Sequence, residues 1–174
     1  MSRRVPRSPD HPIARSPDRT AYVDALHLLG RRELSVHQLR ERLRERDHSQ
    51  DDIERAIGLL IENRALDDRR VAAAYVRSAL AVKGRGRLRI QRELQAMGID
   101  KEVAAEALAE GFGSVDERTL IARALKKKLR GKTTIATPAE YARVYQFLMR
   151  QGFSPGGITA ALRAFRRGDF TDDH

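Results

Sequence analysis

The chain has 174 residues, 41% of them hydrophobic, with no cysteine and a formal net charge of +10. The hydrophobic share is sufficient for one or two compact domains, but no stretch approaches the roughly 18 to 20 uninterrupted apolar residues of a membrane-spanning helix. The absence of cysteine excludes disulfides, thiolate metal sites and cysteine nucleophiles. Since residues 1–20 lack the apolar middle of a signal peptide, we expect a soluble, cytoplasmic protein with no membrane partner.

The positive charge is concentrated towards the C-terminus. Counting Lys and Arg against Asp and Glu gives +3 for residues 1–20, −1 for 21–66, +2 for 67–113 and +6 for 114–174. Clustered basic residues gain free energy by releasing the counterions condensed on nucleic-acid phosphates. The asymmetry therefore favours a polyanionic partner, either nucleic acid or a protein bound to it. A surface that serves only solubility is the alternative.

Residues 1–20 contain four of the six prolines and five arginines. Because this composition cannot bury enough apolar surface to offset the entropy of ordering, we predict a flexible basic tail here, and a second tail over 168–174. From Tyr22 onwards the apolar spacing is helical, and no segment alternates with the period of two that a strand requires. The sequence therefore predicts an all-α protein.

Capping signals divide the rest of the chain into nine short helices. They are predicted over residues 21–32, 36–46, 50–63, 68–82, 87–97, 101–110, 115–130, 138–151 and 155–167. Taken in threes, the helices form three-helix units over 21–66, 67–113 and 114–167. A unit of about 45 residues is marginal as an independent fold, so we expect the units to stack into an elongated, curved array.

Three predicted helix caps, Ser49, Asp100 and Ser154, align the units because each occupies the same place in its unit. The caps are separated by 51 and 54 residues. A large apolar residue stands ten and six positions before each cap, as at Leu39 and Leu43 before Ser49. This pattern is typical of three tandem copies of one unit.

Turn residues support the same alignment. Gly98 and Gly152 lie two residues before their caps, where helices commonly end in the left-handed conformation that glycine tolerates. Asp47 takes that place in the first unit. Two middle helices are predicted to start with capping boxes, from Ser35 with Gln38 and from Thr137 with Glu140.

No pattern of an enzyme is found. Arg130-Gly131-Lys132-Thr133 resembles the end of a phosphate-binding loop, but Lys126 stands where that loop requires a glycine, and a helix precedes it. Gly84-Arg85-Gly86 and Gly111-Phe112-Gly113 lack the third glycine of a dinucleotide fingerprint and are interpreted as helix stops and turns. The five histidines lack metal-ligand spacing, and the carboxylates cluster at helix starts. We predict a non-enzymatic protein without metal or cofactor.

Two clusters of basic residues are candidates for contact with a polyanion. The first follows a helical apolar stripe that includes Leu125 and Leu129, and comprises Lys126, Lys127, Lys128, Arg130 and Lys132. The second runs through a glycine-bearing turn into a helix start, where backbone amides also favour phosphates, and comprises Lys83, Arg85, Arg87, Arg89 and Arg92.

Read together, these residues resemble the RecX family of regulators of the RecA recombinase, over about residues 22–167. Their order and spacing carry the resemblance, more than any single piece. In chain order the pieces are Ala25-Leu26, Arg31-Arg32-Glu33, Leu66-Asp67-Asp68, Tyr75-Val76-Arg77, Lys83-Gly84, Glu93-Leu94, Gly98-Ile99-Asp100, Phe147-Leu148 and Gly152-Phe153-Ser154. Val71, Arg87 and Asp47 depart from the family pattern, at one core position and two turns.

The resemblance implies a curved array of three-helix repeats that binds the RecA filament on DNA. It implies inhibition of filament extension, ATPase, strand exchange and co-protease activity in DNA repair, recombination and the SOS response, without catalysis. We expect a monomer that contacts the filament, or single- or double-stranded DNA, through the two clusters above and through Arg143, Arg150, Arg163, Arg166 and Arg167. A stand-alone DNA-binding module and a helical scaffold for another protein are the alternatives.

Overall fold

The computed structural model describes residues 20–113, 115–130, 132 and 134–167, without the side chains of residues 166 and 167. Over these residues the chain forms nine α-helices and no strand. They are α1 (Ala21–Leu29), α2 (Val36–Arg44), α3 (Gln50–Glu62), α4 (Asp68–Ala81), α5 (Arg87–Ala96), α6 (Lys101–Phe112), α7 (Glu117–Leu129), α8 (Pro138–Gln151) and α9 (Pro155–Arg167). Apart from Thr20, the N-cap of α1, both predicted tails lie outside the described residues.

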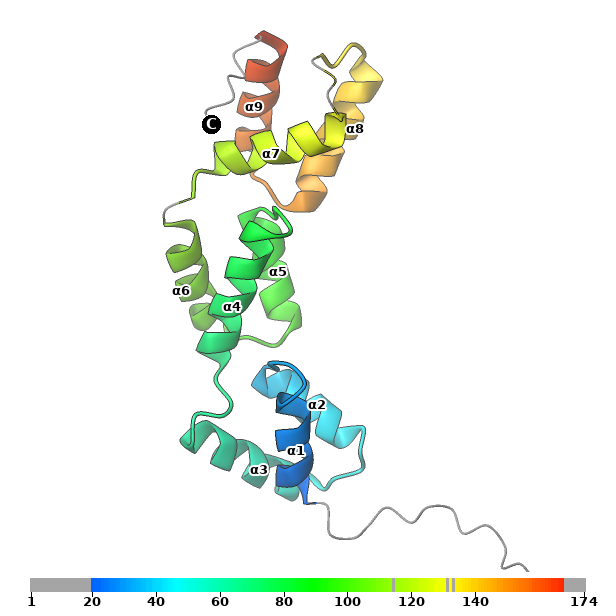
Figure 1. Cartoon of the computed structure of the whole chain (residues 1–174). Coiled ribbons are helices and arrows are strands. Elements are labelled where there is room, and N and C mark those ends of the chain that lie inside the picture. The colour runs from blue at the N-terminus through cyan, green and yellow to red at the C-terminus, as the bar shows by residue number, and fades with distance from the viewer. Residues whose placement is uncertain (1–19, 114, 131, 133, 168–174) are drawn as a thin grey trace, which may run out of the picture.

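The helices form three successive three-helix units, each around its own buried core. The residues ten and six positions before each aligned cap are buried in all three units: Leu39 and Leu43, Ile90 and Leu94, Val144 and Leu148. Figure 1 shows the units following one another along an elongated, curved array. The predicted all-α repeat fold is therefore confirmed, while the limits given to each unit stay a prediction.

Local turn chemistry sets most helix ends as predicted. Asp47, Gly98 and Gly152 all adopt positive φ angles, of 60°, 72° and 89°, so the three units share the left-handed turn. The capping box between Ser35 and Gln38 is complete. The box predicted at the start of α8 is only half formed. Thr137 accepts the N–H of Glu140, but the Glu140 carboxylate accepts the N–H of Ala136 instead of reaching back to Thr137.

Two differences from the predicted helix limits involve glycines. The first helix ends at Leu29 instead of residue 32, since Gly30 serves as its C-cap. Helix α6 continues through Gly111, which the sequence suggested as a stop, to Phe112. Without a side chain, Gly111 lets α6 approach Val76 of α4, whose Cγ1 lies 2.3 Å from where a Cβ at Gly111 would stand. Packing between α6 and α4 therefore outweighs the low helix propensity of glycine at this position.

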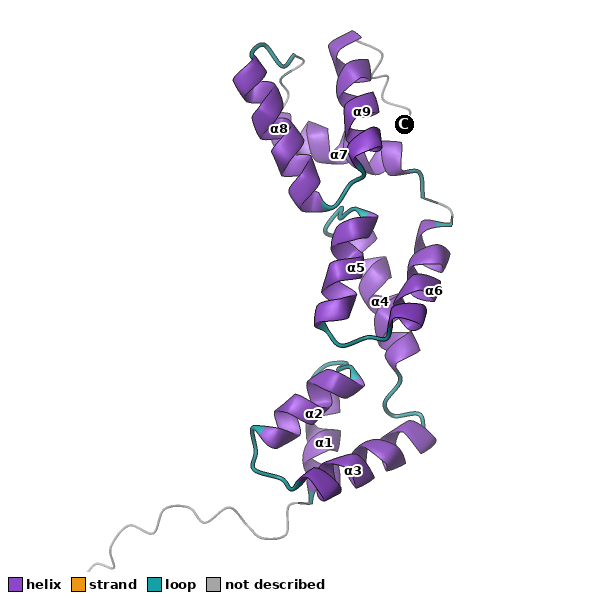
Figure 2. Cartoon of the chain, turned by 180° about the vertical axis from the view of Figure 1, so that it is seen from behind, coloured by secondary structure: helices purple, strands orange, loops and turns teal. Residues whose placement is uncertain are grey.

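Successive units are joined where the start of one middle helix meets the end of the next unit's middle helix. At the start of α5 the N–H of Gly86 donates to the Gln151 carbonyl at 2.8 Å, and the N–H of Leu88 donates to the Gly152 carbonyl at 3.0 Å. At the start of α2, Ser35 Oγ donates to the Met97 carbonyl at the end of α5. The middle helices α2, α5 and α8 therefore run head to tail along one side of the array (Figure 2). Partly positive helix starts meet partly negative helix ends there.

The two junctions differ in their apolar content. Leu80 and Phe112 pack against the cores of both the second and the third unit. The core of the first unit contains only its own residues. Polar contacts join it to the second unit, among them the Val36 N–H, which donates to Asp68 Oδ1 at 2.9 Å. Burial raises the pKa of Asp68, although this hydrogen bond opposes the shift.

Candidate interaction surface

Helix α7 presents the first basic cluster on its exposed side. Ile121, Leu125 and Leu129 are buried against α8 and α9, which leaves the basic residues between them in solvent. Lys126, Lys127, Lys128 and Arg130 are all exposed, and Lys128 Nζ lies 5.1 Å from the centre of the Phe147 ring. Arg130 ends the helix in the left-handed conformation, with φ of 48°. The cluster is therefore a basic ridge on the third unit.

Lys132 belongs to the start of α8 more than to this ridge. Its Nζ donates to Glu140 Oε1 at 3.1 Å. This hydrogen bond is the main cause of the lowered pKa of Glu140, and the hydrogen bond from the Ala136 N–H is the next largest. Lys132 and Glu140 together close the connection from α7 to α8, so part of the Lys132 charge is already balanced.

In the second cluster, Glu93 of α5 balances two of the predicted cations. Arg89 Nε donates to Glu93 Oε1 at 3.0 Å, while Arg85 Nη1 and the Tyr75 hydroxyl donate to Oε2 at 2.5 and 2.8 Å. Burial acts to raise the pKa of Glu93, but hydrogen bonds from Tyr75, Arg89 and Arg85 together leave it lowered. Arg85 and Arg89 are thus held inside the second unit by an ion-pair network.

Lys83, Arg87 and Arg92 remain exposed. Lys83 Nζ lies 5.0 Å from the Tyr75 ring centre, and the Arg87 guanidinium lies 5.6 Å from that of Phe112. Such cation–π contacts hold a side chain in place and leave its charge facing solvent. These three residues therefore remain available to an anionic partner.

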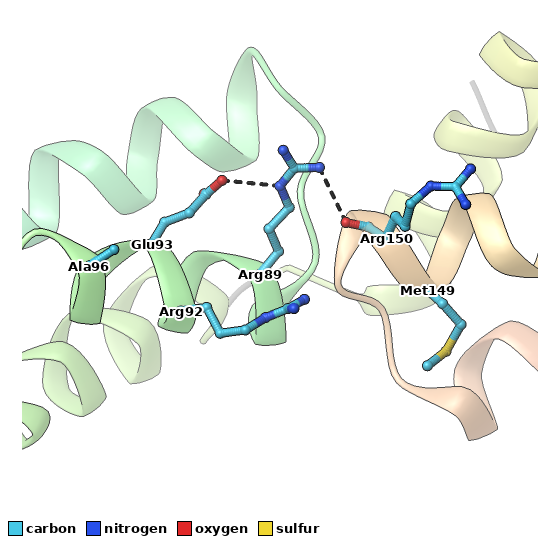
Figure 3. A pocket seen from close by; sticks show the side chains of 6 residues that line it. All are labelled: Arg89, Arg92, Glu93, Ala96, Met149 and Arg150. Atoms are coloured by element: carbon cyan, nitrogen blue, oxygen red, sulfur yellow. Dashed lines mark hydrogen bonds and ion pairs between the residues drawn. The ribbon is translucent and has the colours of Figure 1, made fainter.

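An open hollow lies on the surface between α5 and α8, where the second and third units meet. Its lining comprises Arg89, Arg92, Glu93, Ala96, Met149 and Arg150. Figure 3 shows Arg89 between Glu93 and the Arg150 carbonyl, with Arg92 extending from α5 towards α8. The Arg89 Nη1 donates to that carbonyl at 3.2 Å, so the same guanidinium ties the two units together.

The remaining predicted cations lie on α8 and α9. Arg143, Arg150 and Arg163 are exposed, whereas the side chains of Arg166 and Arg167, in the last turn of α9, lie outside the described residues. The predicted residues therefore form two groups, the α7 ridge and the α5–α8 junction, with single cations beyond them. Sequence reasoning missed Met149 and Ala96 in the hollow. No local pattern indicates them, because α5 and α8 meet only through the stacking of the second and third units.

Among the described residues, no three histidine, aspartate or glutamate side chains gather in a way that could hold a metal ion. Gly84, with φ of 57°, and Gly86, the N-cap of α5, form the turn that the sequence suggested. Within the described ranges, no helix is both long and apolar enough to cross a membrane.

The fold and this surface define a class: a helical-repeat protein whose exposed cations suit an anionic partner. Three family models match the chain in order, namely the first RecX three-helix domain over residues 21–60, the second over 67–108 and the third over 116–162. The chain therefore belongs to the RecX family of regulatory proteins.

Curated relatives support this membership. The regulatory protein RecX of Chromohalobacter salexigens is 38% identical over 130 residues, which are 75% of this chain and 82% of the relative. That of Vibrio parahaemolyticus is 34% identical over 79% of this chain and 86% of the relative. That of Geobacillus kaustophilus is 33% identical over 82% of this chain, but the chain spans only about half, 52%, of its length.

Solved structures show the same fold. The crystal structure of RecX from Lactobacillus salivarius matches with a TM-score of 0.66 and 22% identity, over 83% of this chain and 94% of that one. A second crystal structure, of a regulatory protein RecX, matches with a TM-score of 0.68 and 23% identity, over 82% and 70%. At these identities the likeness supports the architecture alone.

Proposed function

We propose that this protein is a non-enzymatic modulator, mainly an inhibitor, of the RecA recombinase. It binds the RecA–DNA filament in the cytoplasm and limits filament extension, ATPase, strand exchange and co-protease activity. The observation that carries this proposal is the match of all three units, in order, to the three RecX domains. The proposal takes the regulatory role from the family, and the geometry below supports it.

An extended array suits a repeating track such as a protein filament on DNA. Each unit offers a separate surface, and several weak contacts on one chain add through effective concentration. Helices of 13 or 14 residues, such as α7 and α8, are about 20 Å long at 1.5 Å per residue, so three stacked units reach several tens of Å. Such a length can span more than one filament subunit.

Within the array, the α7 ridge is the strongest candidate for electrostatic attraction. Lys126, Lys127, Lys128 and Arg130 are exposed on one helix, and no acidic residue lies on that helix after Glu117. Clustered cations raise the association rate with a polyanion and release its counterions. We assign Arg85 and Arg89 to holding the second unit together, because Glu93 already balances them.

The test replaces the four ridge residues, Lys126, Lys127, Lys128 and Arg130, by glutamine and measures RecA ATPase on single-stranded DNA. We expect inhibition to require about tenfold more protein, since several weak charge contacts of up to about 1 kcal/mol each are lost together. A matched control replaces four exposed arginines elsewhere, Arg31, Arg32, Arg42 and Arg77, and so removes the same charge. Equal inhibition by the ridge variant and the parent would remove α7 from the mechanism.

The same variants separate filament binding from binding to DNA alone. If the ridge contacts phosphates, its loss lowers the slope of log affinity against log salt by about 0.7 to 0.9 for each contact removed. Tight DNA binding by the parent, with RecA ATPase unaffected at any protein ratio, would contradict the regulatory proposal and leave a plain DNA-binding module.

A further inference from the structure

The hollow between α5 and α8 contains more positive charge than its own acid can balance. Glu93 already accepts hydrogen bonds from Arg89, Arg85 and the Tyr75 hydroxyl. Arg89 is in turn fixed by Glu93 and by the Arg150 carbonyl. The carboxylate and these three neighbours therefore form a closed network, and Arg92 and the Arg150 side chain lie outside it.

Arg92 and Arg150 come from different units and border the same hollow. Both are exposed. Arg92 Nε donates to the Leu88 carbonyl at 3.2 Å, which fixes the stem of the side chain and leaves its terminal N–H groups to solvent. In Figure 3 the Arg150 side chain points away from Arg92, so a ligand held by both guanidiniums requires Arg150 to change its rotamer. Met149 and Ala96 add apolar surface to the lining of the hollow.

The junction between the first and second units provides an internal comparison. The end of one middle helix lies against the start of another at both junctions, since Gly98 lies against the His37 side chain there and Gly152 against the Arg89 backbone here. The cap spacings of 51 and 54 residues identify the positions of the first junction that are equivalent to the six lining residues. They are Gln38, Glu41, Arg42, Glu45, Gln95 and Ala96. Three arginines and one glutamate give +2 in the hollow, whereas one arginine and two glutamates give −1 at the aligned positions. The architecture alone therefore does not explain the positive charge.

We propose that this hollow binds an acidic peptide segment of a protein partner. One carboxylate of the segment lies between the Arg92 and Arg150 guanidiniums, and an adjacent apolar side chain contacts Met149. Arginine suits this role because its planar donors bind a carboxylate in a bidentate manner. The inference rests on the proposed function only where it takes the partner to be part of the recombinase filament.

Two features favour a peptide over nucleic acid at this site. The Glu93 carboxylate lines the hollow, and a continuous phosphate backbone would have to pass close to it. The mixture of arginine, methionine and alanine also matches an acidic segment with apolar residues better than a uniformly charged strand. A ligand held by Arg92 of α5 and Arg150 of α8 would, in addition, fix the angle between the two units.

The test uses a short fluorescein-labelled peptide in which glutamate and leucine alternate, and fluorescence anisotropy with the full chain. We expect Arg92→Gln/Arg150→Gln to weaken binding about four- to 25-fold, which is about two- to fivefold for each guanidinium lost. The control Arg77→Gln/Arg118→Gln removes the same charge from exposed positions of α4 and α7 and should change binding by less than about twofold. A peptide with glutamine in place of glutamate should not bind.

Two results with the peptide would overturn the proposal: no binding to the parent chain, or equal weakening by both double variants. A third would be an oligothymidylate whose binding is weakened by Arg92→Gln/Arg150→Gln as strongly as that of the peptide. The last would assign the hollow to nucleic acid. RecA ATPase measured on the same preparations keeps the two proposals apart. Inhibition by a parent chain that does not bind the peptide contradicts this inference alone, whereas peptide binding without inhibition contradicts the regulatory function alone.

Discussion

Two glycines let the backbones of α5 and α8 touch at the junction of the second and third units. A Cβ added to Gly86 would lie 2.4 Å from the Gly152 carbonyl group, and one added to Gly152 would lie 2.3 Å from the backbone nitrogen of Arg89. No heavy atom can be accommodated at such distances without moving backbone. Gly152 also has a φ of 89°, which other residues rarely adopt.

We therefore predict that Gly86→Ala destabilises the protein by about 1 to 3 kcal/mol, the usual range for overpacking a filled site. Gly86 has a φ of −78°, so the backbone conformation itself is open to alanine and the loss reports the contact. Gly58→Ala is the control: it lies inside α3 with no atom within 4 Å of the added Cβ, and should stabilise by about 0.5 to 1 kcal/mol. Urea unfolding followed by circular dichroism measures both. Unchanged stability of Gly86→Ala would mean that the two helix ends are not in contact.

The Glu93 network predicts a pH dependence. The folded pKa of Glu93 is lowered, so its stabilising contribution is present above the ordinary glutamate pKa of about 4.3 and is lost as the pH falls through the folded value. Glu93→Gln should therefore lower the unfolding free energy by about 1 kcal/mol at pH 7, and the gap to the parent should close below about pH 4. Glu110→Gln, at an exposed position of α6, serves as the comparison. A gap that is the same at both pH values would rule out an ionised Glu93 as its source.

At the scale of single elements, caps decide where most helices begin. Asp67, Asp100 and Asp116 each accept backbone N–H groups of the next turn, which satisfies donors that lack helical partners. This information is local, and the sequence predicted all nine helices of the described residues on that basis. The predicted limits differ by three residues at the end of α1, which Gly30 caps, and by two at the end of α6, which continues through Gly111.

One cap depends on a second element, and it yields a further prediction. Ser154, ahead of α9, donates its N–H and Oγ hydrogen to the Glu117 carboxylate of α7 at 2.8 and 2.7 Å, while its Oγ accepts the Gly157 N–H. Glu117→Ala should cost about 1.5 to 3 kcal/mol, as expected for hydrogen bonds to a charged group. Glu102→Ala removes a first-turn acid of α6 that has only the helix dipole to interact with, and should cost about 0.3 to 1 kcal/mol. Equal losses in thermal unfolding would indicate that Glu117 does not hold α9.

At the scale of the whole molecule, the three units are coupled unequally. Phe112 and Leu80 bridge the second and third cores. Polar contacts such as the ion pair between Arg70 and Glu33, at 3.0 Å, join the first unit to the second. Exposed ion pairs contribute little free energy. We therefore expect the second and third units to unfold together, and the first unit to unfold more independently of the second.

Phe112→Ala tests this inequality. We expect a loss of about 2 to 3 kcal/mol, somewhat below a fully buried Phe because the ring is partly exposed, and faster amide exchange in both α4–α6 and α7–α9. Leu39→Ala, at a fully buried position of the first core, should cost about 2 to 5 kcal/mol and accelerate exchange mainly in α1–α3. Hydrogen exchange measured by mass spectrometry resolves the segments. Uniform acceleration across the chain in both variants would show that the array unfolds as a single unit.

The sequence by itself determined the helices, the tandem repeat and the family, because helical periodicity, capping residues and left-handed turns act over a few neighbouring positions. The residues ten and six before each cap are buried as that periodicity required. Charge counts also placed the surplus on the third unit, where the α7 ridge lies.

Only the tertiary structure decided which cations are available to a partner. Arg85 and Arg89 look equivalent to Arg92 in the sequence, yet Glu93 balances the first two and leaves Arg92 at the rim of the junction. The hollow with Met149 and Arg150 likewise arises from residues that α5 and α8 bring together across more than 50 positions. Contacts of that range depend on how whole units stack, and no local pattern records them.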